Sequence, residues 1–315
     1  MFTSALRVVV LAGCASLVAC GTSPSEPTAP PLEGSSARLI EEGGTAGYVH
    51  TISHSRFAIG GNASPRSEFG MQKMVGTDGV FATRPLTSLV GLPMGVFVAI
   101  LVIFFWSAHF FYCLINVKAN LSSPLFYFHI LLQSYLYTGL FITAHDAMHG
   151  TVSPNKKINN FIGALSTFLF AGLSYKKLRE NHYKHHKNPC GDTDPDFYTK
   201  SQNFFLWFFI FMARYVTVWQ ILIVAVLFNV LKLFYPESSI WAFMVAPAIL
   251  GTLQLFFFGT YIPHRKPHLE TMNPHHARTL PKNHLLAMIT CYFFGYHFEH
   301  HDAPHTPWWQ LYKTK

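Results

Sequence analysis

Three short segments of the sequence are rich in histidine, at spacings of three and four residues. They are His145–His149, His182–His186 and His297–His301. Because side chains three or four positions apart lie on one face of a helix, each segment could direct several imidazoles at one point. Eight imidazoles are too many for one metal ion and suit two. The candidate ligands are His145, His149, His182, His185, His186, His297, His300 and His301.

The ligand type does not identify the metal, because imidazole binds iron, copper, zinc and nickel. Zinc sites commonly hold a single ion with four ligands, which fits the count poorly. Other histidines are interpreted differently. His109 and His129 lie inside apolar runs, where we expect structural roles. Four further histidines lie in a polar loop, where we expect them to be solvated: His268, His275, His276 and His284.

The composition indicates what kind of molecule must hold these clusters. The chain has 315 residues, of which 50% are hydrophobic and only 12% are charged. Soluble domains usually carry about a quarter charged residues. The composition therefore excludes a disordered chain, a nucleic-acid-binding module and an ordinary soluble enzyme. Five cysteines without a CxxC pair also argue against a disulfide scaffold and a typical zinc site. The chain is predicted to lie in a lipid bilayer.

Long apolar segments predict an all-α integral membrane fold, because only helices satisfy the backbone in lipid without closing a barrel. Three segments are long and uncharged, namely Leu92–Ile115, Leu125–Thr143 and Ile240–Tyr261. The segment Ile158–Tyr175 is less apolar, and Phe204–Phe234 is interrupted by Arg214. Leu285–Tyr296 is too short to cross.

The clusters constrain the topology, since they must meet on one side of the membrane. The first ends the second span, and the second follows Ile158–Tyr175, so that segment must lie in the interface or re-enter. One crossing then fits before Ile240–Tyr261, near Tyr215–Phe234. The sequence predicts about four transmembrane helices, interfacial helices and a di-metal site at one face.

Charge divides the chain into two parts. Residues 1–88 hold six basic and six acidic residues, whereas residues 89–315 hold 17 basic and nine acidic residues. On an apolar chain this basic excess indicates the cytoplasmic or stromal side of a membrane, rather than a surface that binds nucleic acid. We therefore expect the metal site on that side. Seven of these basic residues lie between Lys156 and Lys187. We expect 89–315 to be the membrane-embedded catalytic domain.

Residues 1–88 are expected to form a leader or targeting segment and a disordered extension. Arg7 precedes the apolar run Val8–Val18, which is typical of a signal peptide. Leu17–Cys20 matches a bacterial lipobox. Organellar targeting, or an extension without an address, fits the Ser/Gly/Pro-rich remainder equally well.

The clusters resemble the histidine boxes of the membrane fatty-acid desaturase and hydroxylase superfamily. Within it, longer segments are similar to the β-carotene ketolases, and the similarity covers roughly residues 90–312. These segments are Phe141–Gly150, His186–Pro189, Asp194–Phe197, Phe258–Arg265, Phe294–His301 and Pro307–Leu311. Phe298 and Tyr198 depart from the usual pattern beside the candidate ligands.

The resemblance implies a non-haem di-iron oxygenase that adds a keto group at C4 of the β-ionone ring of β-carotene, towards echinenone and canthaxanthin. Two O2-dependent hydroxylations and a dehydration would form the ketone, with electrons from a donor such as ferredoxin. It also implies His264 as a ninth ligand. Acidic residues are expected to orient the ligating imidazoles by bonding the ring nitrogen that does not bind metal; the candidates are Asp146, Asp194, Asp196, Glu299 and Asp302. Asp194–Asp196 fits equally well a turn that closes the second cluster.

Alternative functions remain open at this point. A carotenoid 3-hydroxylase or an acyl-lipid desaturase would use the same metal chemistry. A non-catalytic metal-binding membrane protein, such as a transporter, would place ligands near the membrane midplane, whereas these clusters lie at span ends and in loops. The membrane would be a plastid membrane or a bacterial inner membrane, depending on the leader.

Overall fold

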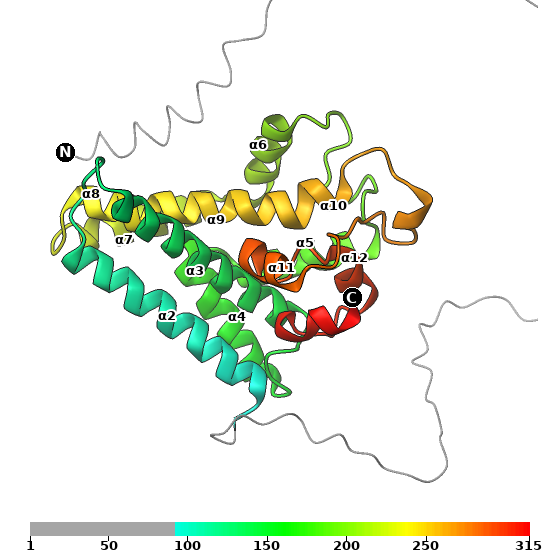
Figure 1. Cartoon of the computed structure of the whole chain (residues 1–315), viewed down its shortest axis with the longest axis horizontal. Coiled ribbons are helices and arrows are strands. Elements are labelled where there is room, and N and C mark those ends of the chain that lie inside the picture. Colours follow the sequence, from blue (N-terminus) through cyan, green and yellow to red (C-terminus); the bar gives the residue numbers. More distant parts are fainter. Residues whose placement is uncertain (1–91) are drawn as a thin grey trace, which may run out of the picture. The chain divides into compact units, whose positions relative to one another are not determined.

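The computed structural model describes residues 92–315, which form helices joined by loops and turns (Figure 1). The predicted leader 1–88, with its Leu17–Cys20 motif, lies outside the described residues.

Three helical segments are long and apolar enough to span a membrane. They are α2 (Met94–Asn116), α3 (Pro124–Met148) and the unbroken segment Glu237–His264. These confirm the spans predicted from the uncharged runs. The third segment contains α8 (Glu237–Ile240), η1 (Trp241–Val245), α9 (Ala246–Phe256), η2 (Phe257–Tyr261) and α10 (Ile262–His264).

A fourth span depends on two helices that meet at a sharp bend. Helices α6 (Phe204–Tyr215) and α7 (Val218–Leu231) differ in direction by 88° and together pass the same length and hydropathy test. The side chain of Thr217 accepts a hydrogen bond from the Gln220 amide and caps α7 at this break. Alone, α7 rises about 21 Å, less than the roughly 30 Å of a bilayer core. The count of three or four agrees with the prediction of about four.

The histidine-bearing elements gather at one end of the bundle. Short helices α4 (Lys156–Ala171) and α5 (Tyr175–Lys187) follow α3, and α10 ends the third span beside them (Figure 1). Helix α4 begins at an Asn155 cap and ends at Gly172, whose φ is +66°. The chain is completed there by η3 (Glu270–Met272), α11 (His284–Cys291), α12 (His297–Asp302) and η4 (Trp308–Thr314).

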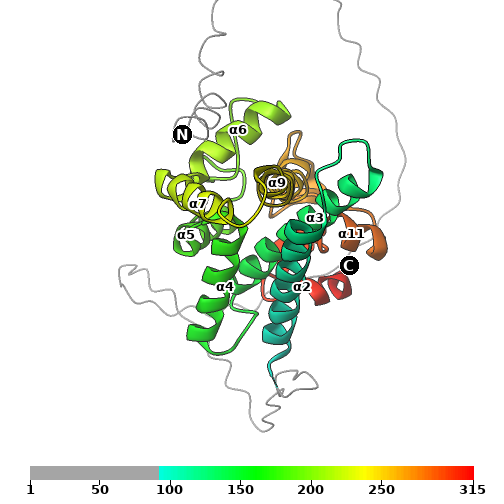
Figure 2. The same ribbon diagram turned by 90° about the vertical axis from the view of Figure 1, so that its left-hand side faces the viewer.

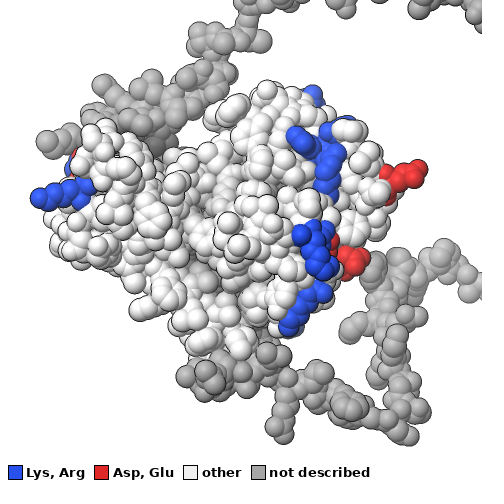
Figure 3. All heavy atoms as spheres, in the orientation of Figure 1, with Lys and Arg blue, Asp and Glu red and all other residues white. Residues whose placement is uncertain are grey.

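Helix α3 lies between α2 and α9 (Figure 2). The core between these helices is rich in aromatic side chains. Trp106 of α2 stacks on Phe110 and meets Tyr137 of α3 edge-on. On the surface of the described residues, Lys and Arg side chains gather at the end with α5 and α10, and others lie near α8 (Figure 3). The surface between these two ends is an uncharged belt. This division is the one expected of a protein that crosses a bilayer.

A close approach between α2 and the loop after α3 depends on a glycine. A Cβ added at Gly95 would lie 2.5 Å from the carbonyl oxygen of Val152. The amide and hydroxyl of Thr151, next to it, both donate to the Asp146 carbonyl. Gly95 thus lets α2 pack against the loop that closes the histidine-bearing end of α3.

We expect Gly95→Ala to destabilise the protein by about 1–3 kcal/mol, because backbone atoms cannot move aside as a side chain can. The midpoint of thermal unfolding in detergent measures this. Ile100→Ala is the control, since Ile100 lies on the same helix and is 48% exposed. Equal midpoints for the two variants would show that the approach is not constrained.

Candidate metal centre

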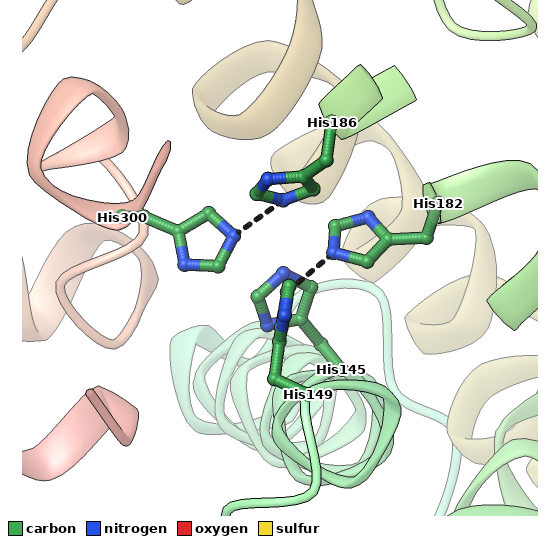
Figure 4. A group of neighbouring side chains, drawn as sticks. All are labelled: His145, His149, His182, His186 and His300. Atoms are coloured by element: carbon green, nitrogen blue, oxygen red, sulfur yellow. Dashed lines mark hydrogen bonds between the residues drawn. The ribbon is translucent and has the colours of Figure 1, made fainter. Parts of the chain in front are cut away.

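Five histidines converge at the end of α3. His145 and His149 come from α3, His182 and His186 from α5, and His300 from α12 (Figure 4). One ring nitrogen of each lies within 4.8 Å of the others. We call these five residues group one.

The rings of group one face each other through nitrogen atoms. The Nε2 atoms of His149 and His182 are 2.6 Å apart, and those of His186 and His300 are 3.0 Å apart. The Nε2 atom of His145 is buried and has no hydrogen-bond partner. Five nitrogens therefore surround one small volume in which a shared cation would satisfy them.

Four other histidines form a second set, which we call group two. His185 lies on α5, His264 ends α10, and His297 and His301 lie on α12. The Nε2 atom of His301 is 3.1 Å from the Nε2 atoms of both His185 and His297. All four residues are buried, and Nε2 of His264 has no hydrogen-bond partner.

The second and third sequence clusters are thus each divided between the two groups. Residues four apart on a helix share a face, so His182 and His186 both point into group one. His185 lies on a different face of α5 and enters group two. The same geometry on α12 sends His297 and His301 to group two and His300 to group one.

The electrostatics of both groups suit a metal ion. Burial lowers the pKa of His149 to about 4 and that of His186 to about 2. Burial likewise holds the pKa values of His182, His297 and His300 well below the ordinary value. These rings are therefore neutral at physiological pH and present lone pairs, which is the form that binds metals.

Asp194 holds one ligand candidate through its other ring nitrogen. Nδ1 of His185 donates to the Asp194 carboxylate at 2.9 Å, which leaves Nε2 directed into group two. The same carboxylate accepts from the backbone amides of Cys190 and Asp196, both at 2.8 Å. Burial alone would lower the pKa of His185, but the carboxylate raises it above the ordinary value.

Two other predicted acidic residues also lie close to the histidines. Oδ2 of Asp196 is 4.0 Å from Nδ1 of His185, and its Oδ1 accepts a hydrogen bond from the Tyr215 hydroxyl. Asp146 is buried beside His145 and accepts the backbone amide of Trp308 at 3.0 Å. The Asp146 contact ties the Pro307–Leu311 segment to the end of α3.

The last two acidic candidates have other partners. Glu299 accepts hydrogen bonds from Lys315 at 2.8 Å and from Thr279 at 2.6 Å. The Asp302 side chain is 70% exposed and lies 3.6 Å from Nε2 of His275. Glu299 therefore fastens the chain around α12, and its oxygens are already engaged outside both groups.

The loop after α10 was expected to hold solvated histidines, and the structure differs. His268, His275, His276 and His284 are all half-buried. Nδ1 of His264 bonds the carbonyl of His276 at 3.0 Å, and the Cys190 sulfur lies 3.5 Å from the same nitrogen. The His276 carbonyl thus joins the loop to His264 of group two. The spacing of side chains in the sequence does not reveal this backbone contact.

Phe294 lies next to both groups. Its ring centroid is 5.0 Å from that of His145 and 5.3 Å from that of His297. A Cβ on Gly259 would collide with this ring, so only a glycine at that position admits it. Two of the segments noted in the sequence, Phe258–Arg265 and Phe294–His301, therefore meet directly.

A separate apolar groove of 490 Å³ lies between α4 and α7. Its lining includes Phe161, Phe168, Tyr175, Trp219 and Ile223 and contains none of the nine histidines. The groove is therefore not part of the candidate metal centre.

Comparison with known proteins adds to this geometry. Residues 122–221 match the family described as fatty acid desaturase. The chain is 38% identical to zeaxanthin 4-ketolase of Chlamydomonas reinhardtii over 74% of this chain and 55% of the relative. It is also 38% identical to β-carotene 4-ketolase of Protosiphon botryoides, over 69% of this chain and 62% of the relative.

A bacterial relative is covered more fully. β-Carotene ketolase of Paracoccus sp. (strain PC1) is 38% identical over 58% of this chain and 76% of the relative. The chain spans little more than half the length of the two algal relatives. No solved structure matches.

Apolar helices with histidine clusters at one end define a membrane protein of the desaturase type. Within that class the chain belongs to the carotenoid ketolase family, as the similarity to the Paracoccus protein shows.

We expect Asp194→Asn to weaken metal binding by about 10- to 100-fold, because an amide supports the His185 ring less well than a carboxylate. Metal per chain, measured after growth at limiting metal, should fall. Asp192→Asn is the matched control, since Asp192 is an exposed neighbour. Unchanged metal content in Asp194→Asn would remove Asp194 from the proposed support of the ligands.

Proposed function

We propose that this protein is a carotenoid ketolase that introduces a keto group at C4 of the β-ionone ring. The observation that carries the proposal is the convergence of nine histidines, six buried and three half-buried, on two adjacent positions. The names of the relatives, zeaxanthin 4-ketolase and β-carotene ketolase, support the substrate class.

In this proposal each histidine group holds one iron ion. Group one would bind the first through His145, His149, His182, His186 and His300, and group two the second through His185, His264, His297 and His301. The irons, with dioxygen and two electrons per step, would supply the oxidation of a C–H bond that acid–base groups cannot break. Two hydroxylations at one carbon followed by loss of water give the ketone.

The chain's own residues would orient the ligands and shield the reaction. Asp194 fixes the His185 ring, the carbonyl of His276 fixes His264, and Asp146 anchors Trp308 over the end of α3. Phe294 places an apolar ring beside His145 and His297, which suits a hydrocarbon substrate. A long polyene would reach this end from the bilayer along the uncharged belt (Figure 3).

Electrons would come from an external donor of the ferredoxin type. Basic residues of α4 and α5 lie at the same end as the histidines, where they could attract an acidic protein. The same charges favour a cytoplasmic or stromal face. A plastid membrane or a bacterial inner membrane is consistent with relatives from algae and from Paracoccus.

The test is pigment analysis of a bacterial host that accumulates β-carotene and expresses the full chain. We expect a product that gains one oxygen and loses two hydrogens per oxidised ring, separated by chromatography and weighed by mass spectrometry. His297→Ala should abolish it, whereas His305→Ala, an exposed histidine outside both groups, should not.

Other outcomes point elsewhere. Oxygen gained without loss of hydrogen, in a product that co-elutes with the 3-hydroxylated standard, would identify a 3-hydroxylase. Unchanged β-carotene from expressed, iron-loaded protein, in hosts supplying either β-carotene or zeaxanthin, would exclude the carotenoid assignment in favour of an acyl-lipid desaturase.

A further inference from the structure

A third polar cluster lies between α2 and α3, far from groups one and two. His109 and Cys113 are one turn apart on α2, and His129 and Gln133 are one turn apart on α3. Helices α2 and α3 are neighbours (Figures 1 and 2). His109 contacts both His129 and Gln133 across this helix pair. His129 precedes His145 by sixteen positions, which is about 24 Å along the helix.

The hydrogen bond to Gln133 leaves the lone pair of His109 on its other ring nitrogen. Nδ1 of His109 donates to Oε1 of Gln133 at 2.5 Å, so Nε2 carries the lone pair. That Nε2 lies 3.1 Å from Nδ1 of His129 and 3.5 Å from Sγ of Cys113. A support of this kind is what orients a metal-binding imidazole through its second nitrogen.

These separations are close to those around one shared ion. Metal–nitrogen and metal–sulfur bonds of about 2.0 to 2.3 Å place donor atoms about 3.3 to 3.7 Å apart. The His109–Cys113 separation of 3.5 Å lies in this range. The His109–His129 separation of 3.1 Å is shorter and equals that between His185 and His301 in group two. Hydrogen bonds can also join these atoms in pairs, whereas one shared ion accounts at once for the convergence of Cys113 and His129 on the same nitrogen of His109.

The donor set and its surroundings select the metal. A thiolate with two imidazoles suits the softer late metals, copper(I) and zinc. Zinc prefers a fourth ligand, whereas copper(I) is satisfied by three. The α2 segment contains no charged residue. Copper(I), one thiolate and two neutral imidazoles sum to zero charge, whereas zinc would leave a net positive charge within an apolar span, which is costly.

We propose that His109, Cys113 and His129 bind one copper(I) ion, with Gln133 orienting His109. On binding, the Cys113 S–H bond breaks, a copper–sulfur bond forms, and the proton passes to water without electron transfer. This site is independent of the proposed oxygenase chemistry, because it shares no residue with groups one and two.

The test uses the full-length, iron-loaded protein in detergent. Copper(I) is supplied without oxygen as its bicinchoninate complex, and copper and iron per chain are then measured by mass spectrometry. We expect wild type to take up one copper per chain, and Cys113→Ala to bind it at least about tenfold more weakly. Cys291→Ala, which removes another fully buried cysteine, should bind as wild type does.

Iron content reports whether each variant is folded, since the two iron positions lie elsewhere. If Cys113→Ala also loses iron, copper uptake is measured instead on Cys113→Ser and His129→Asn, which preserve the size and polarity of the side chains. Equal copper uptake by wild type and these variants, no uptake by wild type, or retention of zinc in preference to copper would each overturn the proposal.

Discussion

The structure depends on the need to satisfy the ring nitrogens of nine imidazoles, six of them buried and three half-buried. A buried polar ring without a partner costs several kcal/mol at worst, and here many ring nitrogens face only one another. Helices α3, α5, α10 and α12 are placed so that these nitrogens share two small volumes. Hydrogen bonds from outside the groups then hold individual rings, as Asp194 holds His185. The apolar spans form the frame that keeps these short elements together.

The sequence segments that resemble the carotenoid ketolases are in contact with one another. Gly259 leaves room for Phe294, and Asp146 accepts the amide of Trp308. Each of these contacts joins a segment that contains one of the three histidine clusters to a segment that contains none. Physical packing around the candidate metal centre therefore accounts for residues whose types have no metal-binding chemistry of their own.

Much of the framework could be predicted from residue types. Uncharged runs located α2, α3 and the third span, and three- and four-residue spacing located eight histidines. The division of α5 and α12 between two groups was not predicted, because residues three positions apart are also neighbours on a helix and spacing alone does not separate His185 from His182. The loop holding His276 could not be placed, because its contact with His264 uses a backbone carbonyl, which no side-chain pattern reports.

The division of the histidines also bears on how the protein acquires metal. Because α5 and α12 each contribute to both groups, an ion bound in one group would immobilise rings that belong to the other. The second ion would then meet a site whose ordering entropy has already been lost, and it would bind more tightly than the first. Loading would be cooperative, so chains with a single ion would be scarce at equilibrium, and empty and doubly filled forms would dominate the population.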